Sequence, residues 1–245
     1  MAAATVATLL SALLTAVALG DSFVGTDEGE TLRGTARPDQ IYGEGGNDRI
    51  VGLTGNDYLE SGPGDDTVDG GPGHELIIGG TGNDRLMAGS GDDHAYAGAG
   101  DDEIIGGQGD DDLFGQVGAD RIFGGPGDDR IYAGAGDDFA DGGAGSDRIT
   151  SEGDATLLGG AGGDTIDARG DRVVVEGGPE PDRIRTGRGD DQIDGGSGGD
   201  VIHSGPGRDV VEALDGEPDV IDCGKGRDTV RADPDDRLTD CERRQ

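Results

Sequence analysis

A nine-residue period dominates this chain. Residues 79–132 consist of six consecutive copies, GGTGNDRLM, AGSGDDHAY, AGAGDDEII, GGQGDDDLF, GQVGADRIF and GGPGDDRIY. Each copy has a small residue at position one, glycine at position four, an acid at position six and an aliphatic residue at position eight. A repeat this short predicts a solenoid, in which each unit packs mainly on its neighbours.

The two parts of the repeat favour different local structures. The glycines permit φ > 0, so the first six residues can form a tight turn with its carbonyl oxygens directed at one point. The carboxylate at position six completes an all-oxygen site, which suits a hard divalent ion such as calcium. The last three residues read polar, aliphatic, variable, which is the alternation of a short strand. The aliphatic residues at position eight are therefore the expected core.

The pattern G-G-x-G-x-D-x-U-x resembles the calcium-binding nonapeptide of the RTX (repeats-in-toxin), or haemolysin-type, family. The resemblance implies an all-β parallel β-roll, in which each repeat makes half a coil and repeats n and n+2 stack and share an ion. Residues 219–242 also resemble the C-terminal ends of secreted actinobacterial proteins of this type. With Ca²⁺ as the implied cofactor, the expected metal ligands are Asp48, Asp57, Asp66, Asp84, Asp93, Asp102, Asp111, Asp120, Asp129, Asp138, Asp147, Asp164, Asp182, Asp191, Asp200, Asp209, Asp219 and Asp228.

Composition indicates that folding depends on cations. The chain of 245 residues has 53 glycines, and its 53 acidic against 19 basic residues give a net charge of −34. So few large apolar side chains do not support a conventional core, because apolar burial must offset roughly 1–2 kcal/mol of backbone ordering per residue. A disordered acidic chain would share this composition, but the strict period argues against it. Nucleic acid is a poor partner for this charge, and none is expected.

The chain divides into four segments. Residues 1–20 form an Ala/Leu/Val run ending in small residues, which is typical of a signal peptide, although no Lys or Arg precedes it; a membrane anchor is the alternative. We therefore expect a secreted, extracellular protein without a membrane span in the mature chain. Residues 21–42 keep the period but lose the glycines, which predicts a capping coil. Residues 43–231 form the expected calcium-binding roll, and residues 232–245 a C-terminal cap.

The period is irregular at three places. Residues 151–158 are one residue short and place Thr156 at position six, and residues 168–176 place Val173 there, so calcium sites are expected to fail at both. We interpret 151–176 as an irregular coil within one solenoid; two separate stacks are the alternative. Ala213 reads as a single inserted residue.

The chain has two cysteines, Cys223 and Cys241. Behind a signal peptide this pair favours a disulfide, although two small buried residues are the alternative. A covalent link there would lock the end of the roll.

No catalytic constellation stands out from the repeat. His74, His94 and His203 occupy different repeat positions and are not expected to converge, while every Asp at position six recurs as a ligand. We therefore expect no enzymatic activity; an enzyme that cleaves polysaccharides with two carboxylates is an alternative. The role of the roll is open between a structural or adhesive module and a detached, chaperone-like or accessory segment of a secreted hydrolase.

Position nine carries a feature that calcium binding does not require. Seven successive repeats fill this outward position with large apolar residues, and alternate repeats align Tyr96, Phe114 and Tyr132 on one face. Stacked side chains can simply stabilise a sheet, but an apolar strip on an acidic surface also indicates a contact site. We expect this face to bind a cell-surface polysaccharide or a protein, or to mediate self-association.

Overall fold

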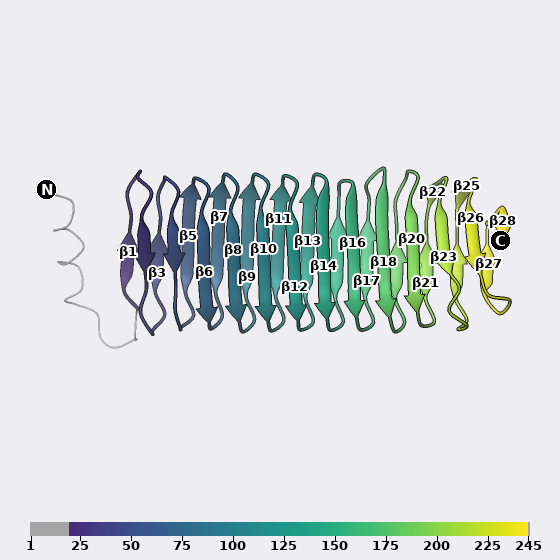
Figure 1. Ribbon diagram of the computed structural model, residues 1–245, viewed down its shortest axis with the longest axis horizontal. Coiled ribbons are helices and arrows are strands. Elements are labelled where there is room, and N and C mark those ends of the chain that lie inside the picture. The colour runs from purple at the N-terminus through teal and green to yellow at the C-terminus, as the bar shows by residue number, and fades with distance from the viewer. Residues whose placement is uncertain (1–19, 245) are drawn as a thin grey trace, which may run out of the picture.

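The computed structural model describes residues 20–244, and this part of the chain contains strands and turns but no helix. Figure 1 shows one long, straight stack of coils, with β1 (Ser22–Val24) and β28 (Arg243–Arg244) at opposite ends of the stack. Successive strands alternate between two parallel sheets, so each repeat makes half a coil. The predicted all-β parallel β-roll is therefore confirmed. The expected signal peptide, residues 1–20, lies outside the described residues except for its last position.

The two sheets, called sheet I and sheet II, have 13 strands each. Sheet I contains β1 (Ser22–Val24), β3 (Gln40–Tyr42), β5 (Tyr58–Pro63), β7 (Leu76–Thr81), β9 (His94–Ala99), β11 (Asp112–Val117), β13 (Arg130–Ala135), β15 (Arg148–Ser151), β17 (Thr165–Ala168), β19 (Arg183–Arg185), β21 (Val201–His203), β24 (Val220–Asp222) and β27 (Arg237–Thr239). Sheet II contains β2 (Thr31–Arg33), β4 (Arg49–Val51), β6 (Thr67–Pro72), β8 (Arg85–Ser90), β10 (Glu103–Gln108), β12 (Arg121–Pro126), β14 (Asp138–Ala144), β16 (Ala155–Ala161), β18 (Val173–Pro179), β20 (Gln192–Ser197), β23 (Val210–Ala213), β26 (Thr229–Ala232) and β28 (Arg243–Arg244). Two short strands, β22 (Pro206–Gly207) and β25 (Lys225–Gly226), pair with each other in the turns.

Equivalent positions of alternate repeats lie directly above one another. Between β11 and β13, for example, Leu113 pairs with Ile131 and Phe114 with Tyr132, in parallel. This register brings residues 18 apart in sequence into contact. Every side chain at one repeat position therefore forms a ladder along the roll.

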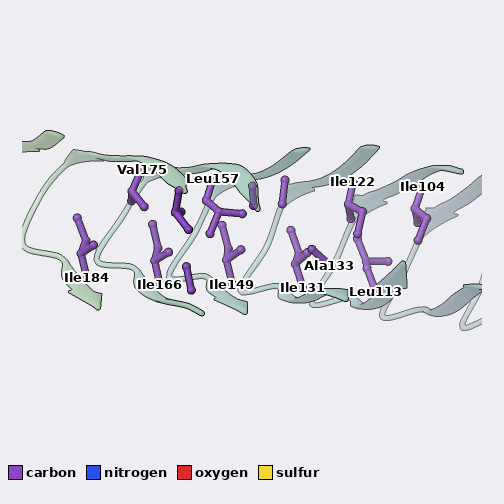
Figure 2. Packing of buried hydrophobic residues seen from close by; sticks show 14 of the residues in the cluster. Ile104, Leu113, Ile122, Ile131, Ala133, Ile149, Leu157, Ile166, Val175 and Ile184 are labelled. Carbon is purple, nitrogen blue, oxygen red and sulfur yellow. The ribbon is translucent and has the colours of Figure 1, made fainter. Parts of the chain in front are cut away.

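The core is a double row of position-eight side chains between the sheets. Every such residue from Ile50 to Ile149 is fully buried, as the sequence predicts. Figure 2 shows Ile104 and Ile122 pointing inward from one sheet and Leu113 and Ile131 from the other. Position one also faces inward, but only small residues fit there. The interior is therefore thin, and apolar packing covers the middle of each coil while the turns enclose polar groups.

Two details of the expected register are wrong. In the short coil, β14 and β16 pair Asp138 with Ala155 and Phe139 with Thr156. Ala155 is thus the inward residue at position six, and Thr156 is the partly exposed residue after it. This repeat is one residue shorter in the turn before Ala155, because pairing with β14 keeps the buried face of β16 in register.

The second wrong detail concerns Ala213, which is not an inserted residue. It is buried at position one and pairs with Ala232 across β23 and β26. The extra residue lies in the following turn, 214–218, where Leu214 is half exposed. A turn absorbs an insertion at lower cost than a strand, since a one-residue slip in a strand would reverse its buried and exposed faces.

Strands also form at both ends of the repeat array. Residues 21–42 contribute β1, β2 and β3, and the tail contributes β27 and β28, so the same two sheets run from one end to the other. Cys223 and Cys241 form a disulfide with Cα atoms 5.1 Å apart, as expected. Residues 20–244 contain no helix that is long and apolar enough to cross a membrane.

Candidate metal centre

The position-six carboxylates lie inside the turns along both edges of the roll. Positions six, eight and one face inward because side chains alternate along each strand. From Asp48 to Asp228, the carboxylate residues at position six are at most 3% exposed. They form two columns, one at the turns that enter sheet I and one at the turns that enter sheet II. All 18 aspartates predicted from the sequence as ligands lie in these columns.

One oxygen of each of these aspartates links neighbouring coils. The backbone N–H of Asp102 donates to Oδ1 of Asp120 at 3.0 Å, and that of Asp120 donates to Oδ1 of Asp138 at 3.1 Å. The same bond, at 2.8 Å, joins Asp111 to Asp129 in the other column. Sequence reasoning missed this link, because a repeat pattern does not reveal which carboxylate oxygen a neighbouring coil will use.

The other oxygen has no hydrogen-bond partner. Within residues 20–244, this holds for Oδ2 of every predicted aspartate and for both carboxylate oxygens of Glu75. A buried polar atom without a partner is costly, and a buried charge more so. A whole series of such atoms, one in nearly every turn, indicates a bound group of opposite charge.

The surroundings of these oxygens fit a hard cation. A Cβ built on Gly118, at position four, would lie 1.7 Å from the carbonyl oxygen of Gly100 and 3.2 Å from Oδ1 of Asp120. Only glycine therefore leaves room at position four for this main-chain carbonyl of the preceding coil, on the side of the turn that also holds the carboxylate. The residues present supply carboxylate and carbonyl oxygens, which are the ligands that Ca²⁺ prefers.

The donor set does not suit a transition metal. Over the described range 20–244, no three or more His, Cys, Asp or Glu side chains come together in a group that could hold a metal ion. His74, His94 and His203 are exposed, and in this range none of them belongs to such a group. A metal centre in these turns must therefore use backbone oxygens beside one or two carboxylates, which favours calcium over zinc.

Burial changes the protonation of these acids. Burial, together with nearby aspartates, raises the pKa of Asp111 and Asp120 to about 7, although the backbone hydrogen bond to Oδ1 acts in the opposite direction. Burial likewise raises the pKa of Glu75 to about 9. In the roll without a cation, ionising these carboxylates at neutral pH therefore costs free energy, because the charges would be buried.

The unpartnered oxygens stop at both ends of the array. In the first coil, the backbone N–H and the hydroxyl of Thr26 bind the carboxylate of Glu30, and those of Thr35 bind Asp39. At the far end, the N–H of Asp233 donates to Oδ2 of Asp236. Protein donors thus satisfy the terminal carboxylates, and the candidate metal centres extend from Asp48 to Asp228.

The column that enters sheet II is interrupted. Its position-six residue is Ala155 in one coil and Val173 in the next, both buried. In the turn before Ala155, Asp154 instead accepts hydrogen bonds from the backbone of Asp171 at 3.0 Å and Arg172 at 2.9 Å, and its carboxylate pairs with the Arg172 side chain at 3.5 Å. The inner column therefore has no carboxylate in these two coils, and the failure of calcium binding there stays a prediction.

A second ladder runs along the outside of the turns, at position five. Oδ1 of Asn83 accepts from the backbone N–H of Asp101 at 2.9 Å, in the opposite direction to the inner ladder. Nδ1 of His74 takes the same role toward Asp92 at 2.9 Å. The sequence signal for this ladder is the recurrence of Asn, Asp or His at position five.

Fold and turns together define a parallel β-roll with a buried carboxylate in most of its turns, one oxygen of which has no hydrogen-bond partner. The family model of the RTX calcium-binding nonapeptide repeat matches residues 24–59, 43–77, 51–86, 78–113, 114–149 and 176–211. These matches cover more than half of the chain, so the protein belongs to the RTX calcium-binding repeat family. The β-roll of this family is typically a calcium-binding module rather than a catalyst, and such repeats are typical of extracellular proteins. No curated protein matches the chain.

Proposed function

We propose that this protein is a secreted structural or adhesive module whose β-roll folds when Asp48 to Asp228 bind calcium. The observation that carries the proposal is the unpartnered, buried Oδ2 of the position-six aspartates. Without a cation, the chain would have to bury charges at neutral pH in a molecule whose net charge is already −34. Bound calcium supplies positive charge between carboxylates stacked one coil apart.

The chain's own groups define what each turn does. Oδ1 fixes the carboxylate by its bond to the preceding coil, glycine at position four allows the carbonyl approach, and Oδ2 remains free for the ion. The 20 or so turns act together because every aspartate touches two coils. This arrangement couples the binding of ions to the stacking of coils, which gives a cooperative transition.

Two neighbouring residues provide a matched test. Asp129 is a buried position-six ligand, whereas Asp128 is an exposed position-five residue whose Oδ1 accepts a bond from Ser146 at 2.7 Å. Asp128→Asn should be silent, since Asn occupies position five elsewhere. Asp129→Asn keeps the Oδ1 acceptor but removes the charge, so equilibrium dialysis should show fewer bound calcium ions. Equal stoichiometry for the wild type and both variants would contradict the proposal.

A further inference from the structure

The two broad surfaces of the roll carry different side chains. Face I is formed by the outward residues of sheet I and face II by those of sheet II, at positions seven and nine of each repeat. Along both faces the residues change character between the middle and the C-terminal third of the roll. The two changes occur at the same coils, which matters for what each face can contact.

The middle of each face carries an apolar ladder at position nine. On face I, the rings of Tyr96, Phe114 and Tyr132 stack with centroids 4.5 and 4.8 Å apart and interplanar angles of 6° and 2°. On face II, Met87, Ile105 and Phe123 are paired in register and partly exposed. The stacked rings on face I cover one another, so they present edges rather than faces outward. This argues against sugar rings stacking on them and for a flat apolar partner.

Charged residues beside these ladders are satisfied within their own face. On face I, Asp112 contacts His94 and Arg130, both at 3.2 Å. On face II, Arg85 pairs with Glu103, and Arg121 lies over the rings of Phe123 and Phe139. The apolar ladders are therefore the features of these coils that are left for a partner.

In the C-terminal third, β19 on face I carries two arginines, with Asp167 beside Arg185, and β18 and β20 on face II carry two acids. On face I, Arg183 and Arg185 of β19 are exposed, and neither forms an ion pair within residues 20–244. On face II, Glu176 and Asp194 lie opposite each other on β18 and β20. Like charges directly opposite each other destabilise a sheet. The two acids therefore do not contribute to the stability of the roll, and we look for a role for them in a contact.

We propose that face I of one molecule packs against face II of a second copy, with the two rolls side by side and parallel. In this arrangement, the Tyr96–Phe114–Tyr132 ladder meets the Met87–Ile105–Phe123 ladder while Arg183 and Arg185 meet Glu176 and Asp194. Both rolls repeat at about 4.8 Å per coil, so contacts that match at one coil match along the whole length. The strand β19 follows β18 and precedes β20, which places its arginines at the level of the two acids.

Other pairings of the same faces fail. An antiparallel arrangement cannot bring together both the apolar ladders and the opposite charges. Packing of face I on face I would bring arginines together, and face II on face II would bring acids together. The favoured contact is therefore heterologous, and because every copy retains one free face of each kind, it propagates into an open array.

This inference rests on the proposed function, because the apo chain with net charge −34 repels its own copies. Each calcium ion carries two positive charges, so a number of ions equal to half of this net charge would neutralise the chain. Calcium should therefore be required for assembly as well as for folding, and sodium chloride should weaken the contact between Arg185 and the acids by screening.

Sedimentation velocity in millimolar calcium, over a range of protein concentrations, tests the proposal. The wild type should form assemblies that grow with concentration. Arg183→Glu/Arg185→Glu and Glu176→Lys/Asp194→Lys should each weaken self-association at least about tenfold, since like charges then face each other. Lys225→Glu, which removes a positive charge from the turn strand β25, should assemble as the wild type does. Circular dichroism on the same samples checks that every variant folds.

Mixing the two charge variants gives the sharpest result. One variant then has two acidic faces and the other two basic faces, so the mixture should assemble although neither protein does so alone. A folded, calcium-loaded wild type that stays monomeric at every concentration would overturn the proposal and leave the proposed function intact. Assembly of the variants at wild-type affinity would overturn the pairing of faces.

Discussion

The backbone N–H of Asp102 donates a 3.0 Å hydrogen bond to Oδ1 of Asp120, one coil further along the roll, while Oδ2 of Asp120 has no partner. The Asp120 side chain therefore joins two coils through Oδ1 and leaves Oδ2 available to bind a cation. Because the N–H of Asp120 is in turn held by Asp138, a change at one turn affects the turns on either side.

Asp120→Ala should thus cost more than the same change near the end of a column. Asp120 lies in an unbroken run of carboxylates from Asp48 to Asp138, whereas Asp209 belongs to a short group with Asp191 and Asp228. We expect Asp120→Ala to raise the calcium midpoint of folding more than Asp209→Ala, since it disturbs more coupled neighbours. Equal midpoints for the two variants, measured by circular dichroism, would contradict the nearest-neighbour coupling.

The gap in the sheet II column can be tested with adjacent residues. Ala155 faces inward at position six, and Thr156 faces outward. Ala155→Asp should place a carboxylate in the column and add calcium-binding capacity, while also destabilising the calcium-free roll through burial of a charge. Thr156→Asp should change neither. If dialysis shows extra calcium with Thr156→Asp and none with Ala155→Asp, the register described for this coil is wrong.

Two neighbouring glycines should differ in their tolerance of alanine. Gly107 has φ +118°, and a Cβ there would lie 1.9 Å from the backbone oxygen of Gly89. Gly106→Ala instead places a Cβ 2.4 Å from Oδ2 of Asp111 and 2.7 Å from the backbone oxygen of Gly124, without a positive φ and at a position that holds alanine in Ala88 and Ala97. We expect Gly107→Ala to lower the free energy of unfolding in calcium by about 1–3 kcal/mol. Gly106→Ala should cost clearly less in the same urea titration, and the reverse order would be inconsistent with the described turn.

Acid should stabilise the calcium-free roll. Burial raises the pKa of Asp84 and Asp147 to about 7, while an unfolded aspartate titrates near about 3.9. Between these values the folded chain holds protons that the unfolded chain has released, so stability is present at low pH and is lost as the pH rises toward 7. Calcium-free protein should therefore show more β-structure at about pH 5 than at about pH 7.5. A roll that becomes more stable as the pH rises would contradict the burial of neutral carboxylates.

Much of the fold could be predicted because the repeat carries its information locally. The inward positions six, eight and one follow from strand alternation, and Ile50, Leu113 and Ile149 are buried accordingly. Where the period slips, local information is insufficient. A missing or extra residue can be placed anywhere in a turn, and only strand pairing decides that Ala155 rather than Thr156 faces inward.

For the candidate site, too, the sequence predicts one part of the arrangement and not the other. The sequence predicts which aspartates enter the turns but not how their two oxygens divide between a hydrogen bond and an ion. It also does not show that Thr26 and Thr35 satisfy the first two carboxylates, because these contacts depend on the exact path of the turn. The alignment of opposite charges on the two faces needs the register of both sheets and could not be read from one repeat.

The central claim is that calcium, bound by the turn carboxylates, drives the chain into the roll. Far-ultraviolet circular dichroism of the purified protein during a calcium titration at neutral pH tests it most directly. We predict a largely disordered spectrum in excess chelator and a cooperative gain of β-structure with a midpoint near about 10⁻⁴–10⁻³ M calcium, the range of extracellular modules. Full β-structure in excess chelator at neutral pH, unchanged by added calcium, would contradict the claim.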